Sequence, residues 1–127
     1  MKKKLIEDNI FYSFCEFVYD CGEEEFLEYA NKKNGRNYTA TGAQGKFIWA
    51  ETEDRFLVCI WINHEENYET LAHEILHLTR FWLQDYYKID LTKQTEEVYT
   101  LFHSFYFGQC IDFIKQSKKK KRKKNKK

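Results

Sequence analysis

The sequence predicts an α+β protein with an N-terminal helix or helices, a small antiparallel β-sheet or hairpin, and then two antiparallel helices. Two patterns predict this order. Apolar residues recur at spacings of three to five in residues 5–33 and again after residue 67, as they do on one face of a helix. Residues 37–63 are instead rich in β-branched and aromatic side chains, which favour strands. The chain has 127 residues, which is room for one core, so we expect a single domain.

Charge divides the chain into an acidic body and a basic tail. Residues 117–127, SKKKKRKKNKK, contain nine Lys or Arg residues and no acid. The net charge of the whole chain is +1, so subtracting these nine charges leaves about −8 for residues 1–116. A segment as charged as the tail does not pack into a core. We therefore expect one domain over 1–116 and a disordered Lys-rich tail over 117–127, which could hold nucleic acid or an acidic partner without sequence choice.

The first predicted element is the helical stretch at residues 5–33, whose apolar positions are separated by acidic ones. Gly22 could divide this stretch into two helices, and the dipeptide Asn34-Gly35 is a strong stop and turn signal. A helix or a pair of helices is therefore expected before the strands begin.

The second predicted element is a hairpin formed by the segments NYTATGAQGKFIWA and RFLVCIWIN, joined by the short polar link ETEDR. Gly42 and Gly45 lie in the first segment and mark a turn or a bulge. Residues 56–62 are nearly all apolar, so we expect this strand to be covered on both faces.

Two further helices complete the predicted fold. Asn67 is a suitable cap for a helix over residues 68–87, which has a continuous apolar stripe. Thr92 can cap a last helix over about 93–115, which would return antiparallel to the first.

The segment TLAHEILHL contains the candidate site. His73 and His77 are four residues apart, so both project from the same face of the predicted helix, one turn apart. That separation lets both imidazoles reach one tetrahedral ion at about 2.0–2.1 Å. Glu74 lies about 100° around the helix from His73, where it can reach a water but not easily join the ligands. The pattern therefore predicts a Zn²⁺ site with two histidine ligands and Glu74 as a general base.

A third ligand should come from another segment, because catalytic zinc usually has three protein ligands. The spacing HExxHxxGxxH is excluded, since Arg80 and Leu83 stand where it needs Gly and His. Glu96 and Glu97 open the last predicted helix, and Glu97 lies at the edge of its apolar face, roughly 90° from the centre, while Glu96 lies nearly opposite. This favours Glu97 as the ligand and keeps Glu96 as the alternative. The competing hypotheses are two histidines on an ordinary core helix and an exposed first-turn acid that the helix dipole favours.

These residues carry a resemblance to a known group. TLAHEILHL, preceded by a hairpin that ends in IWIN and followed about twenty residues later by TEEVY, resembles the gluzincin branch of the zincin metallopeptidases. It is similar in particular to small HExxH proteins of phage and prophage genomes. The resemblance spans roughly residues 47–114; the short chain and the lysine tail depart from the family pattern.

The resemblance implies a minimal zincin-like fold and a zinc-dependent peptidase acting on a peptide or protein. It implies zinc on His73, His77 and Glu97, with Glu74 taking a proton from the attacking water and passing it to the leaving amine. It also implies that the strand before the motif helix, residues 56–62, pairs with the substrate backbone. The alternative is a non-enzymatic phage or mobile-element accessory protein with a structural zinc site and a basic tail that binds nucleic acid or an acidic partner.

The remaining expectations concern compartment and neighbouring residues. The start MKKKLIEDNIF lacks the apolar stretch of an export signal, no window approaches 18 uncharged apolar residues, and the four cysteines form no CxxC pair. We therefore expect free thiols, no membrane partner and a cytoplasmic location. The resemblance implies that the cell is bacterial or phage-infected, with a virion as the alternative. We expect His103 and Tyr99 to be structural, and His64 to be an exposed loop residue.

Overall fold

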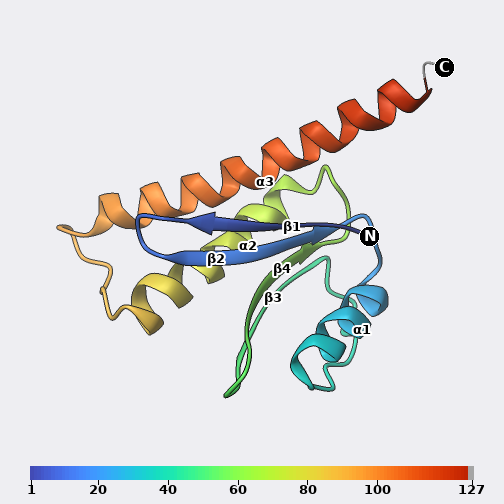
Figure 1. The fold of residues 1–127 in the computed structure, drawn as a ribbon. Coiled ribbons are helices and arrows are strands. Elements are labelled where there is room, and N and C mark those ends of the chain that lie inside the picture. Colours follow the sequence, from blue (N-terminus) through green and yellow to red (C-terminus); the bar gives the residue numbers. More distant parts are fainter. Residues whose placement is uncertain (126–127) are drawn as a thin grey trace.

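The structure is a computed structural model that describes residues 1–125 (Figure 1). It is an α+β fold in which a four-stranded sheet is combined with helices. The elements, in chain order, are β1 (Lys2–Asp8), β2 (Ser13–Tyr19), α1 (Glu23–Asn34), β3 (Gly45–Glu51), β4 (Phe56–Ile62), α2 (Tyr68–Arg80), the π-helical segment η1 (Phe81–Tyr86) and α3 (Glu96–Asn125). The predicted class is confirmed, whereas the predicted order of elements is not.

The sheet is mixed, with strand order β1-β2-β4-β3. β1 and β2 form an antiparallel hairpin, β2 and β4 are parallel, and β3 and β4 form a second antiparallel hairpin. The expected hairpin is confirmed, since Phe47 stands opposite Ile60, although its first strand begins only at Gly45 and leaves the earlier part of the predicted segment outside the sheet. β3 and β1 are the two edges of the sheet.

Helices cover both faces of the sheet, so the fold has three layers (Figure 1). β4 illustrates this, because its side chains alternate between two hydrophobic cores. Val58, Ile60 and Ile62 pack with α2 and α3, whereas Cys59 and Trp61 pack with α1. The prediction that residues 56–62 are covered on both faces is therefore confirmed.

The N-terminal prediction is wrong: residues 2–8 and 13–19 form strands, and the only helix before the second hairpin is α1. The physical reason lies in β2, which is buried on both faces, so its sequence FCEFVY does not alternate between apolar and polar residues. The spacing of the apolar residues in β2 is therefore also compatible with a helix. The turn that joins β1 to β2 is held by Asp8, whose carboxylate accepts the N–H groups of Ile10 (3.0 Å) and Phe11 (3.2 Å).

The stop signal at the end of α1 is confirmed. Gly35 follows the helix in the left-handed conformation, with φ 67°, and its N–H donates to the carbonyl of Asn31 (2.9 Å). Gly22 does not divide a helix; it precedes α1 in an extended conformation.

The predicted helix 68–87 corresponds to α2 and η1 together. Asn67 caps it as expected, because its side-chain oxygen accepts the N–H of Thr70 (3.4 Å). The last helix begins at Glu96 rather than at 93, since Thr92 and Thr95 form a hydrogen-bonded turn before it.

α3 also extends far beyond its predicted end at 115 and crosses the expected domain boundary at 116 without a break. The prediction of a disordered tail is therefore wrong for residues 117–125, while 126–127 lie outside the described residues. Two effects favour this helix: Lys and Arg are good helix formers, and cations at a helix C-terminus interact favourably with its dipole. Within residues 1–125, no helix is both long and apolar enough to cross a membrane.

Candidate metal centre

Helix α2 presents its two histidines to solvent while it is fixed to the sheet by its opposite side. Leu71, Ile75 and Leu78 are fully buried against the sheet and α3. His73 and His77 are both exposed. This amphipathic arrangement follows from the sequence, because the apolar residues recur every three to four positions. The helix therefore provides a rigid base for two accessible imidazoles.

The two imidazoles converge. The Nε2 atom of His77 lies 3.2 Å from the Nε2 atom of His73, and the ring planes are 80° apart. Two nitrogen ligands at about 2.0–2.1 Å from one tetrahedral ion would lie about 3.3–3.4 Å from each other. The pair therefore has both the donor type and the spacing that a zinc ion requires.

Glu74 lies between the two histidines in sequence but is buried, with only 7% of the residue exposed. Burial raises the pKa of its carboxyl above the ordinary value, and positive charge from His77, His73 and Lys46 lowers it in part. Within the described part of the chain, no side chain donates a hydrogen bond to this carboxylate. Glu74 is thus an acid with a raised proton affinity and free acceptor capacity beside the imidazole pair.

The edge strand β3 begins directly beside Glu74, at Gly45. A Cβ atom at this position would lie 2.4 Å from Thr70 Cγ2, 3.1 Å from the carbonyl oxygen of Trp61 and 3.2 Å from Glu74 Cγ. No ordinary side chain fits there without displacing its neighbours. The absence of a side chain at Gly45 therefore brings the edge strand against the helix that carries the histidines.

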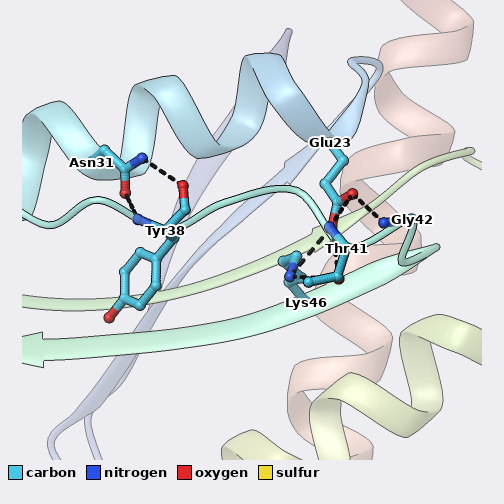
Figure 2. Close-up of polar contacts among 6 residues, drawn as sticks. All are labelled: Glu23, Asn31, Tyr38, Thr41, Gly42 and Lys46. Atoms are coloured by element: carbon cyan, nitrogen blue, oxygen red, sulfur yellow. Dashed lines mark hydrogen bonds and ion pairs between the residues drawn. The ribbon is translucent and has the colours of Figure 1, made fainter.

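A clamp on α1 holds the loop that leads into β3 (Figure 2). The carboxylate of Glu23 accepts the N–H groups of Thr41 (3.1 Å) and Gly42 (2.9 Å) and forms an ion pair with Lys46 (3.3 Å). Earlier in the same loop, the backbone of Tyr38 exchanges two hydrogen bonds with the side chain of Asn31. α1 thereby fixes the start of β3, although it lies on the other face of the sheet.

Aromatic side chains continue the same side of β3 beyond Gly45. Phe47 and Trp49 both contact Phe81 at the end of α2, with ring centroids 5.7 Å and 4.9 Å apart. Trp49 remains 49% exposed. The exposed edge strand therefore carries an apolar surface along the helix that presents the histidines.

The third predicted ligand does not join this pair. Within residues 1–125, no group of three or more His, Cys, Asp or Glu side chains is arranged to hold a metal ion. Glu96 and Glu97 are both exposed in the first turn of α3. α3 contacts α2 at Ala72, about 100° around the helix from His73. The assignment of Glu97, and the choice between Glu97 and Glu96, remain predictions.

The other three singled-out residues have structural contacts. His64 is exposed in the loop after β4, where its Nδ1 accepts the N–H of Glu66 (3.1 Å). His103 donates from Nε2 to the Ala72 carbonyl (3.1 Å) and so links α3 to α2. Tyr99 is buried and donates its hydroxyl to the carbonyl of Ile89.

Sequence reasoning missed the contribution of Gly45, Lys46 and Glu23. Gly45, the second glycine in TGAQGKF, was a visible signal that another part of the chain comes close to the backbone there, yet nothing in the sequence shows which segment does so.

The comparison with protein-family models, curated proteins and solved structures finds no match for this chain.

Proposed function

We propose that this chain is a zinc-dependent metallopeptidase that hydrolyses a peptide or protein substrate. The observation that supports this most directly is the 3.2 Å approach of the His73 and His77 Nε2 atoms, which suits two ligands of one tetrahedral ion. Glu74, next to them, has the raised proton affinity that a general base needs near neutral pH.

The histidines would hold the ion from one side, and an acid at the start of α3 would complete the set. Glu97 is our proposed third ligand, with Glu96 as the alternative. A zinc ion bound there would supply a Lewis acid that polarises a peptide carbonyl and lowers the pKa of a water molecule.

Glu74 would take the proton from the attacking water and pass it to the departing amine. Its burial supports this role, because desolvation brings the pKa of a carboxyl closer to neutrality. Its free acceptor capacity supports it as well, since a base engaged by another side chain would first have to lose that partner.

The substrate would bind along β3 rather than along β4. Residues 56–62 were predicted to pair with the substrate, but β4 is already paired with β2 on one side and β3 on the other. β3 has a free edge, and edge strands offer unpaired N–H and C=O groups to an extended peptide. An added strand would run beside Gly45, Phe47 and Trp49, close to Glu74 and the aromatic surface.

Zinc content and peptide cleavage test the proposal together. We expect the wild type to bind one zinc and to cleave an unstructured protein such as casein. Glu74→Gln should retain zinc and lose about 10²–10⁴-fold in kcat. Glu69→Gln is the matched control, since Glu69 is an exposed acid in the first turn of the same helix. His77→Asn should lose zinc, and whichever of Glu96→Gln and Glu97→Gln loses zinc identifies the third ligand.

A chain without bound zinc would contradict the proposal, because the two imidazoles would then simply share a hydrogen bond. Zinc binding without cleavage in any variant would favour the second candidate, a phage or mobile-element accessory protein with a structural zinc site. That candidate is favoured by one specific observation, the ordered basic end of α3.

The four free cysteines suit a reducing compartment, so we place either protein in the cytoplasm of a bacterial or phage-infected cell, or in a virion.

A further inference from the structure

The basic end of α3 does not stand alone, because the lysines at the start of β1 lie beside it. α3 runs along the sheet in the direction opposite to β1, so its C-terminal end and the N-terminus lie at the same end of the molecule (Figure 1). Residues 118–124 are seven consecutive Lys or Arg residues, and residues 2–4 are three consecutive lysines. The fold thus gathers cations from the two ends of the sequence.

A groove of about 660 Å³ separates these two segments. Lys2 and Lys3 line one wall, and the lysines of α3 line the other. Of the β1 lysines, Lys4 places its ammonium group 5.9 Å from the ring centroid of Phe113, whereas the ammonium group of Lys3 lies 4.4 Å from the ring centroid of Tyr29, on the α1 side of the sheet. Among residues 1–125, six lysines and one acid, Asp20, line the groove. The ring of Phe113, which is only partly buried, forms an apolar part of its surface. The groove is therefore strongly positive on both walls and aromatic between them.

Contacts with the rest of the protein fix both walls. Lys118 pairs with Glu65 (3.6 Å) and Glu66 (3.7 Å), which ties the basic part of α3 to the loop after β4. On the other wall, the ammonium group of Lys2 lies 5.8 Å from the ring centroid of Tyr19, on the neighbouring strand. The lysines that face the groove are therefore presented by a folded scaffold.

We propose that this groove binds single-stranded nucleic acid, with its phosphates between the β1 lysines and the α3 lysines. Proteins that bind single-stranded nucleic acid combine a positively charged groove with aromatic side chains. The cations pair with the phosphates of the nucleic-acid backbone, and a base can stack on the aromatic ring. A duplex keeps its bases paired and stacked inside the helix, so none of them is free to stack on the ring of Phe113. The site rests on neither the histidine pair nor peptide cleavage.

Two other polyanions fit the surface less well. An anionic membrane would bind a basic helix most firmly through apolar side chains on its other face, but residues 115–125 include no large apolar residue. An acidic protein would need several anchoring aromatic or arginine contacts, whereas the described residues that line this groove include one aromatic residue, Phe113, and no arginine.

Fluorescence anisotropy of the full-length protein with a labelled 12-nucleotide single strand tests the site at several salt concentrations. We expect log K to fall with log[salt] with a slope of about −0.7 for each phosphate contacted. The double variant Lys2→Gln/Lys4→Gln should reduce the magnitude of that slope by about 1.4, and Lys120→Gln/Lys121→Gln should reduce it by about as much. The control Lys32→Gln/Lys93→Gln removes the same charge at positions that do not line the groove and should keep the wild-type slope.

The β1 variant is decisive, because a basic tail acting alone would bind equally well without Lys2 and Lys4. If that variant behaves as the control does, the groove is not the site. Tighter binding of a duplex of equal length would also overturn the proposal, as would stronger competition by phosphatidylserine vesicles or polyglutamate than by unlabelled single strand. Zinc content and cleavage play no part in these measurements, so the peptidase proposal succeeds or fails separately.

Discussion

At Gly45 the edge strand lies closer to helix α2 than a side chain would permit. We expect Gly45→Ala to destabilise the protein by about 1–3 kcal/mol, as other overpacked sites do, because the new methyl group meets Thr70 Cγ2 and the Trp61 carbonyl oxygen. Chemical denaturation would measure the loss. Thr70→Ser removes the nearest clashing atom, so Gly45→Ala should cost less in that background.

Gly108 provides the opposite control. It lies within α3, and a Cβ atom there would meet no atom within 4 Å. Gly108→Ala should therefore stabilise the protein by about 0.5–1 kcal/mol, because alanine has the higher helix propensity. Equal effects at both positions would show that the contact at Gly45 does not limit its side chain.

At the scale of single residues, the sequence predicted what one helix determines. His73 and His77 converge because a spacing of four residues places them one turn apart, whatever the rest of the fold does. Glu74 and Gly45 meet only because β3 pairs with β4, and no local pattern contains that information. The third ligand is harder still, since it depends on how α3 approaches α2.

At the scale of elements, the loop before β3 depends on the carboxylate of Glu23. Partial desolvation raises the pKa of this carboxyl, but hydrogen bonds from the Thr41 and Gly42 N–H groups and from Lys46 lower it further, so the net pKa is below the ordinary value. A lowered folded-state pKa adds stability above the unfolded pKa of about 4.3, and that stability is lost as the pH falls through the folded value.

Glu23→Gln should therefore lower the denaturation midpoint at pH 6 and have a much smaller effect at pH 3. Amide hydrogen exchange should also accelerate at Thr41 and Gly42, whose N–H groups lose a charged acceptor. Glu24→Gln is the matched control, because Glu24 is an exposed acid in the same first turn of α1. A pH-independent difference between Glu23→Gln and the wild type would show that the ionised carboxylate does not hold the loop.

The elements that the sequence predicted well are those whose signals are local. α2 has an apolar stripe and a capping Asn67, and both signals are local. The first hairpin was mistaken for a helix because β2 is buried on both faces, which removes the alternation that identifies a strand. The tail was predicted to be disordered from its charge, yet α3 continues through it, with Lys118 paired to Glu65 and Glu66.

At the scale of the whole molecule, the two candidate sites lie beside opposite edge strands of the sheet. The histidine pair lies beside the free edge of β3, whereas the basic groove lies beside the other edge strand, β1. The core between them contains the middle strands and three buried thiols, Cys15, Cys59 and Cys110. The stability of both candidate sites therefore depends on the same interior.

That interior makes the protein sensitive to alkaline pH. Burial raises the pKa of Cys15, Cys59 and Cys110 in the folded state, whereas the unfolded thiol has a pKa of about 8.5. Stability that is complete below pH 8.5 is thus lost as the pH rises toward the folded values, because the unfolded chain releases protons that the folded chain keeps. Three thiols would remove roughly 4 kcal/mol of unfolding free energy by pH 9.5, before the unfolded tyrosines ionise.

Urea denaturation between pH 7.5 and 9.5, with chelator and reductant present, would measure this loss. Cys59→Ala should reduce the slope of unfolding free energy against pH by up to about 1.4 kcal/mol per pH unit, whereas Cys21→Ala should reduce it less, because Cys21 is only partly buried. Under native conditions Ellman's reagent should react first with Cys21, and with the other three only on unfolding. Rapid reaction of all four thiols at pH 8 would mean that the sheet and its helices open far more readily than this packing implies.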